Sequence, residues 1–158
     1  MPTVKYLNIQ IFGAEAVRRQ LFRGQMAAGN MRPVLEDVAD DMMSVVGLNF
    51  SSEGRRGGGR WSALSPQRMK QKLKAGYPPE ILIATGALHD SMTQRGDPDQ
   101  YLKVTNNSIN LSSYLPYAVV HTTGSGRLPK RDYTKILSSD RQRWVTMCEN
   151  YLRSAMGF

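Results

Sequence analysis

Apolar residues recur three and four positions apart between Arg32 and Gly47, and this spacing dictates a local structure. They are Leu35, Val38, Met42 and then Val45 or Val46. Because an α-helix turns once in about 3.6 residues, these side chains lie on one face. A helix with one apolar face must bury it against another element. The segment therefore predicts a long helix packed on a core.

Three more helices are expected from similar signals. The first runs from about Ala14 to Ala28 and ends at Gly29-Asn30. A short basic helix begins with Ser65 as N-cap and stops at Gly76. Ser138 or Ser139 caps a closing helix, whose apolar stripe is expected to face the core. That stripe comprises Trp144, Cys148, Leu152 and Met156, joined by Val145 and Tyr151.

The rest of the chain favours extended structure. Leu102 and Val104 are expected to face Ile109 and Leu111 across a hairpin that turns at 105–108. Further extended segments are predicted at 4–12, at 81–83 before a short helix that Thr85 caps, and at 114–124 around Pro116. The expected fold is α+β: a small antiparallel sheet of about four strands, packed by two N-terminal helices and a C-terminal helix, with long flexible loops.

Composition excludes several classes of function. The chain has 158 residues, enough for one domain spanning 1–158. One cysteine, Cys148, excludes an internal disulfide, and the widely separated His89 and His121 are not a metal motif. We therefore expect no catalytic residues, metal or cofactor. With no apolar run long enough for a bilayer and no signal-peptide pattern, we expect no membrane contact and residence in a cytoplasm.

The stretch Phe50–Pro66, FSSEGRRGGGRWSALSP, contains a glycine-rich loop with three arginines. A phosphate-binding P-loop needs a Lys followed by Ser or Thr after its last glycine, and none follows here. The dinucleotide fingerprint also fails, because the preceding residues predict an amphipathic helix and not a buried strand. The simpler interpretation is a flexible loop over about 51–60.

The formal net charge of +8 favours an anionic neighbour, either nucleic acid or an acidic protein surface. The charges are segregated along the chain. Residues 54–76 contain seven basic residues and no acid, whereas the helix at 32–47 carries four acids: Glu36, Asp37, Asp40 and Asp41. These acids form a solvated face or, in the alternative, a docking surface. A basic block and an acidic helix also allow head-to-tail pairing between copies.

The order of these elements resembles the phage virion-morphogenesis family of Mu-like and related tailed bacteriophages. The resemblance covers about 49–152 and rests on short motifs in a shared order. They are Trp61 and Leu64; Thr85-Gly86 and Leu88; Tyr117, His121 and Gly124; Pro129, Arg131 and Tyr133; and then Leu137 and Asp140.

This resemblance implies a structural protein of tail completion or head-tail joining, located at the neck or tail top of the virion. It implies a homo-oligomeric ring, expected to be a hexamer, that meets other neck and tail proteins such as the connector or stopper, the tail terminator or the tail tube. Genomic DNA passes such a junction, so sequence-independent phosphate contact is expected. We assign that contact, or an inter-subunit contact, to Arg55, Arg56, Arg60, Lys130 and Arg131, and a ring interface to the acidic helix.

Two alternatives belong to other classes. A free nucleic-acid-binding module is suggested by the net charge and by Trp61 beside arginines. However, the chain has no helix-turn-helix pattern and no series of stacking aromatics. A small enzyme would need Asp90, His89 and His121 to be brought together by folding, and nothing in their spacing indicates that.

Overall fold

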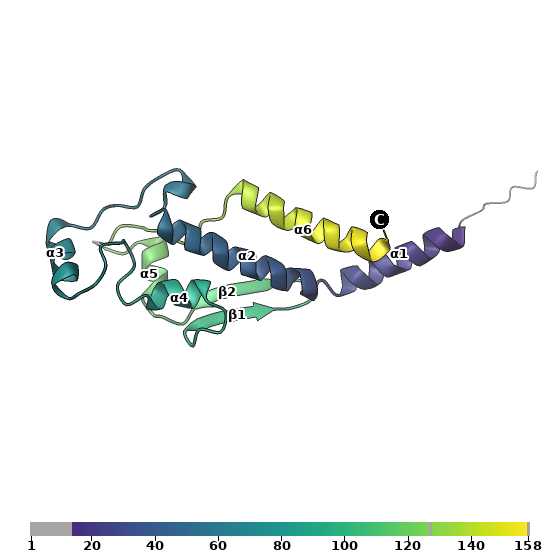
Figure 1. Cartoon of the computed structure of the whole chain (residues 1–158), viewed down its shortest axis with the longest axis horizontal. Helices are drawn as coiled ribbons and strands as arrows, with labels where there is room; N and C mark the ends of the chain where they lie inside the picture. The colour runs from purple at the N-terminus through teal and green to yellow at the C-terminus, as the bar shows by residue number, and fades with distance from the viewer. Residues whose placement is uncertain (1–13, 127, 158) are drawn as a thin grey trace, which may run out of the picture.

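The computed structural model describes residues 14–126 and 128–157 and places six α-helices, one 3₁₀ turn and two strands in them. Their order is α1 (Ala14–Gly29), α2 (Arg32–Ser51), η1 (Arg55–Gly57), α3 (Pro66–Lys74), α4 (Ala87–Thr93), β1 (Gln100–Val104), β2 (Ile109–Ser113), α5 (Ala118–Thr123) and α6 (Ser138–Met156). The molecule is elongated, with α3 at one end and α1 at the other (Figure 1). The α+β class with a small sheet is confirmed.

Helix α2 is the central element and contacts α4, α6 and both strands. Its buried face contains Val34, Val38, Ala39, Met43, Val45, Val46, Asn49 and Phe50. The helix predicted from the apolar spacing is therefore confirmed, and it extends beyond Gly47 to Ser51. The extension matters because Asn49 and Phe50, in the last turn, make contacts with segments far along the chain.

The β1–β2 hairpin forms as predicted. Leu102 pairs with Leu111, and Val104 pairs with Ile109, in an antiparallel register. The turn closes through the Thr105 N–H, which donates to the Ser108 carbonyl at 2.9 Å. The alternating pattern was sufficient here because period-two burial and a polar turn fix the register together.

Other predicted strands are absent from the described residues, which contain only this two-stranded sheet. The strand expected at 4–12 lies outside the described residues. The segment expected to be extended around Pro116 forms helix α5 instead. It contains β-branched residues, but Thr122 and Thr123 direct their hydroxyls back to the Val119 carbonyl, and the buried Ala118 packs in the core. Tertiary packing has overridden local strand propensity.

The segment 81–83, also expected to be extended, is a turn. Leu82 adopts a φ of 64°, a left-handed conformation unusual for a residue with a branched side chain. Ile81 is buried in the core while its N–H donates to Glu53 at 3.2 Å. The turn thus directs Ile81 inward and bends the chain into α4.

Phe50 is the centre of the core. Its side chain is 1% exposed, with the ring of Trp61 edge-on at 6.0 Å and that of Tyr133 stacked at 5.2 Å. His89 lies edge-on at 5.3 Å. Such offset and edge-on arrangements are the favourable ones for aromatic rings. The core therefore joins α2 to the loop after η1, to α4 and to the segment before α6.

Helices α1 and α6 contact each other at the other end of the molecule (Figure 1). The approach is close, since a Cβ at Gly24 would lie 2.9 Å from Met156. The stripe predicted for α6 is only partly buried: Trp144, Cys148 and Leu152 are intermediate, and Val145 is 49% exposed. The expectation that the whole stripe faces a core is therefore wrong for Val145.

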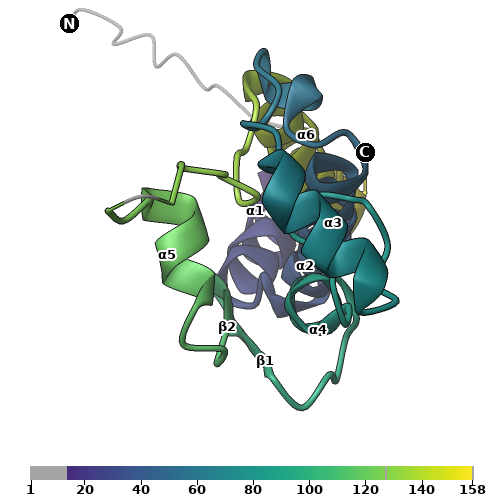
Figure 2. The ribbon, with the colours of Figure 1, turned by 90° about the vertical axis from the view of Figure 1, so that its left-hand side faces the viewer.

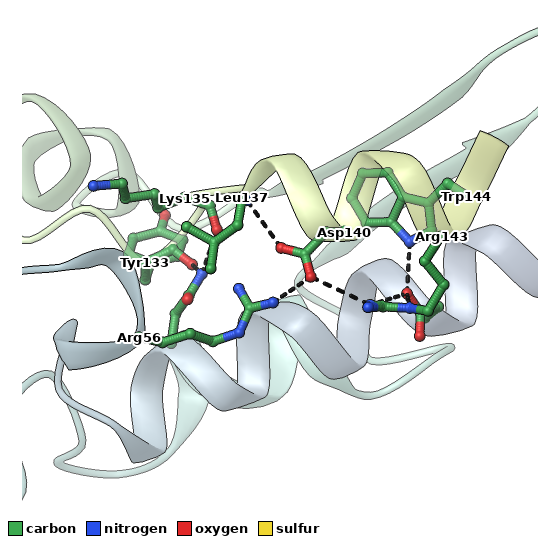
Figure 3. Close-up of polar contacts among 9 residues, drawn as sticks. Arg56, Tyr133, Lys135, Leu137, Asp140, Arg143 and Trp144 are labelled. Carbon is green, nitrogen blue, oxygen red and sulfur yellow. Dashed lines mark hydrogen bonds and ion pairs between the residues drawn. The ribbon is translucent and has the colours of Figure 1, made fainter. Parts of the chain in front are cut away.

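The cap of α6 also differs from the prediction. Neither Ser138 nor Ser139 caps the helix; the carboxylate of Asp140 accepts from the Leu137 N–H at 2.9 Å. Asp140 is fully buried and forms an ion pair with Arg56, which lies in the segment 52–65 between α2 and α3, the Gly/Arg loop (Figure 3). Arg143 also reaches Asp140, at 3.3 Å. One carboxylate thus caps a helix and holds a loop distant in sequence.

Burial alone would raise the pKa of Asp140, but the hydrogen bonds from Arg56 and the Leu137 N–H outweigh it and hold the pKa below its ordinary value of 3.8. We predict that Asp140→Asn costs about 3 kcal/mol of stability, because it leaves the guanidinium of Arg56 without its counter-charge. Denaturant unfolding at neutral pH measures this loss. The exposed Asp37→Asn is the matched control and should change stability by less than about 0.5 kcal/mol.

The same pair predicts a pH dependence. A lowered native pKa stabilises the fold above the unfolded pKa, near 3.8, and this contribution is lost as the pH falls through the native value. The stability difference between wild type and Asp140→Asn should therefore shrink below about pH 4. A difference that stays constant between neutral pH and about pH 3 would contradict the ion pair.

Candidate functional site

A cleft of about 580 Å³ lies at the α3 end of the molecule and is lined by several segments distant in sequence. Figure 2 views this end, with α5 on one side and α3 and α4 on the other. The lining residues come from 63–72, 82–88, 117–121 and 128–131. This volume falls within the roughly 300–1,000 Å³ typical of ligand-binding clefts.

Lys72 contributes a buried cation to the cleft. The side chain is 4% exposed, and Nζ donates to the carbonyls of Glu80 at 2.6 Å and Ile83 at 2.5 Å. Burial lowers the pKa of Lys72, with Glu80 acting in the opposite direction. Helix α3 presents this side chain inward while its other charges stay exposed. Lys72 therefore holds the 80–83 turn against α3.

Arg131 contributes a second buried cation. The Nε and one Nη of its guanidinium donate to the Ser62 carbonyl at 3.1 and 2.9 Å. The backbone N–H of Arg131 donates to the His121 carbonyl at 2.7 Å. Burial lowers the pKa of Arg131. A guanidinium remains charged despite such a shift, so this wall carries a permanent positive charge. Arg131 forms no ion pair with any residue of the described ranges.

His121, on α5, lies in the same wall. Its Nδ1 is buried and lacks a hydrogen-bond partner among the described residues, and the ring lies edge-on to Tyr117 at 6.2 Å. Burial and the charge of Arg131 lower the pKa of His121, which favours the neutral imidazole. No Asp, Glu or Cys lines the cleft, so its lining provides neither a carboxylate partner for this histidine nor a thiol nucleophile.

The Gly/Arg loop encloses a second, more open pocket of about 360 Å³. Its walls include Gly57–Gly59, Arg60, Lys130 and Lys135. Lys135 Nζ donates to the Gly57 carbonyl at 2.6 Å, and Arg60 forms a 2.9 Å ion pair with Glu53. The loop is thus anchored to the body, while Gly58 and Gly59 have open space beside them.

The five basic residues expected at DNA or at a neighbouring subunit divide into two groups. Arg55 and Arg60 have side chains 64% and 62% exposed, and Lys130 is exposed. Arg56 and Arg131 instead direct their guanidinium groups into the chain, to Asp140 and to the Ser62 carbonyl. Only the exposed group is positioned to meet an external phosphate or carboxylate.

The acidic helix is also largely occupied by contacts within the chain. Arg95 bridges Glu36 at 2.9 Å and Asp40 at 2.8 Å. Asp41 accepts from Arg143 at 2.6 Å and from the Trp144 indole at 2.5 Å. Asp37 alone of the four is exposed without an ion pair to a described residue. Asp40 stays solvent-exposed while it pairs with Arg95, whereas Glu36 and Asp41 are partly buried, and all three tie α2 to the α4–β1 loop or to α6.

The structural motif residues identified in the sequence gather at one place. Most of them line the cleft: Leu64, Thr85, Gly86, Leu88, Tyr117, His121 and Pro129. Trp61 packs in the adjoining core, and a Cβ on Gly124, whose φ is 76°, would approach Lys130 N at 3.1 Å. The predicted Thr85 cap is weak, with Ala87 N–H at 3.4 Å, and Gly86 is the N-cap residue of α4.

Sequence reasoning missed two anchoring residues. Asn49 is 2% exposed, and its Nδ2 donates to the carbonyls of Tyr133 and Lys135 at 2.9 and 2.8 Å. The sequence pattern indicates Lys72 only as one cation of a basic surface helix. For Asn49, the sequence does contain a signal, because its position continues the apolar face of α2. The i+3 spacing from Val46 indicates a buried polar residue that needs partners.

We predict that Lys72→Met lowers the free energy of unfolding by about 2 kcal/mol, because the Glu80 and Ile83 carbonyls lose their donor. Thermal or urea unfolding measures the change. The exposed Lys70→Met on the same helix is the matched control, and an equal loss in both variants would contradict an anchoring role for Lys72.

In the described part of the chain, no group of metal-ligating side chains is present and no helix is long and apolar enough to cross a bilayer. No curated protein and no solved structure is significantly similar to the chain. A family model, described as the phage virion morphogenesis family, matches residues 13–153, which include all of the cleft and the Gly/Arg loop. The chain therefore belongs to the phage virion morphogenesis family.

Proposed function

We propose that the protein acts in tail completion or head-tail joining, as a ring of copies around the path of the DNA. Family membership implies a structural role in phage virion assembly and association with the virion. One observation supports the ring in particular. The molecule is elongated, and its two ends carry unlike surfaces. Such a molecule builds heterologous contacts, and these close into rings when the rotation between copies allows it.

Contact between copies is assigned first to α1. Val17, Leu21, Phe22 and Met26 are all more than half exposed on it, although they are large apolar residues. At about 100° per residue, Phe22 and Met26 lie one turn apart on the side away from Gly24, which meets α6. Exposed apolar groups of this kind mark interaction sites. We assign these apolar side chains to a contact with the neighbouring copy in the ring, and Asp37 is a further residue of that contact.

DNA contact is assigned to the exposed cations beside the Gly/Arg loop. Arg60 and Lys130 line the open pocket, and Arg55 is an exposed residue of η1. The backbone at Gly58 and Gly59 allows close approach of another chain, since nothing lies near their Cβ positions. Cations on such a surface attract phosphates without reading sequence. Arg56 and Arg131 support this surface from inside and do not contact the DNA.

The oligomer is tested by light scattering on the purified protein, alone and after mixing with tails that lack it. We predict a ring, or monomers that assemble on tails, and loss of that assembly in Phe22→Glu. Gln25→Glu adds the same charge to an exposed position of α1 and should assemble like the wild type. A wild-type monomer that ignores tails would contradict the ring.

The DNA contact is tested by the triple substitution of Arg55, Arg60 and Lys130 to Ser. We predict fewer joined particles and normal assembly on tails, because the ring forms but the phosphate contact is lost. The control removes three exposed charges elsewhere, with Lys74, Lys103 and Arg141 to Ser. If phage yield is equal in the two variants, the loop has no role in joining.

A further inference from the structure

We propose that the cleft between α3 and α5 binds an extended segment of a different virion protein, one that carries an acidic side chain beside an apolar one. This goes beyond the ring and the DNA contact, and only the identification of the partner as a virion protein rests on family membership. Three observations support it: the cations of the cleft form no ion pair, its walls are apolar, and this chain's own surfaces fit it poorly.

The cations of the cleft form no ion pair within the described ranges, although the charge of Glu80 acts on Lys72. Arg68 lies exposed on α3, and Lys72 and Arg131 are buried beneath the surface. No carboxylate lines the cleft. By contrast, the cations around α2 pair with its acids. Charge left unbalanced in a concave site is complementary to a carboxylate.

The walls of the cleft are apolar and partly open. They include Leu64, Leu82, Ile83, Leu88, Leu128 and Pro129. Leu128 is 49% exposed, and Tyr117, at the rim, is 43% exposed. A ligand that is only an anion would leave these side chains in water. An apolar side chain next to the carboxylate would cover them, as in binding clefts whose apolar walls bury the ligand while a few polar groups fix its orientation.

A second copy of this chain fits the cleft poorly. Helix α1, on which Val17, Leu21, Phe22 and Met26 are exposed, also carries Arg18, Arg19 and Arg23, which the cations of the cleft would repel. The acids of α2 are mostly engaged with Arg95 and Arg143. The backbone of duplex DNA supplies phosphates, and its apolar thymine methyls lie inside the major groove, away from the phosphates that the cations of the cleft would contact. The remaining match is a peptide segment of another protein.

The test uses methyl-labelled full-length protein and a short synthetic peptide in which Leu and Glu alternate. We expect the methyl NMR signals of Leu64, Ile83 and Leu88 to shift with the peptide concentration. Two control peptides, alternating Leu with Lys and Ser with Glu, should bind at least about tenfold more weakly, which corresponds to about 1.4 kcal/mol. No shift of these methyls, or equal shifts with either control, would overturn the proposal.

A charge reversal localises the interaction. Arg68→Glu should weaken binding of the Leu/Glu peptide about tenfold. Lys70→Glu makes the same change on α3 at an exposed position that does not line the cleft, and it should leave binding within about twofold. Both residues are exposed, so both variants should fold, and near-identical methyl spectra without peptide confirm that. Equal weakening in the two variants would overturn the cleft as the site.

The occupant in the particle is identified by a photo-crosslinking amino acid at Leu128. Mass spectrometry of purified particles should find it joined to an acidic and apolar segment of another virion protein. Crosslinks to a second copy of this chain, to DNA alone, or to nothing would each overturn the proposal. A failure of the ring in light scattering would not affect the peptide titration, so the two proposals are tested separately.

Discussion

The packing of Phe50 against three rings is the contact on which the rest of the structure depends. The rings come from Trp61, His89 and Tyr133, so one side chain at the end of α2 joins the Gly/Arg loop, α4 and the segment before α6. Its neighbour Asn49 secures the backbone of that last segment by two hydrogen bonds. Core residues line both pockets, Leu88 the cleft and Trp61 the pocket of the Gly/Arg loop, so the geometry of both depends on this core.

Ion pairs between acidic and basic side chains are unevenly distributed over the molecule. Along α2 the acids meet Arg95 and Arg143, and Asp140 meets Arg56, so these charges hold elements of the chain together. At the α3 end, Lys72 and Arg131 donate to backbone carbonyls and form no ion pair with a described residue. In the cleft, cations without an ion pair therefore lie beside accessible apolar side chains.

Sequence patterns predicted those features that depend on local periodicity. The long α2 helix, the Leu102–Leu111 register and the Ser65 cap all follow from neighbours within a few positions. The α5 helix and the role of Asp140 did not follow, because partners distant in sequence decide both. The motif residues were identified individually, but nothing in the sequence showed that Leu64, Thr85, Tyr117 and His121 share a cleft with the buried Lys72.

The contacts that close the core have a consequence for synthesis. Asn49 bonds to residues 84 and 86 positions later, and Arg56 pairs with an aspartate 84 positions later. Closing such long loops is slow compared with forming a helix or a hairpin. While the ribosome is still translating the second half of the chain, α2 has no Tyr133 against which to bury Phe50. Helix α4 and the β1–β2 hairpin can cover part of α2 earlier, but the part at Phe50 stays open to water until the last quarter of the chain emerges, and exposed apolar surface of this kind favours aggregation.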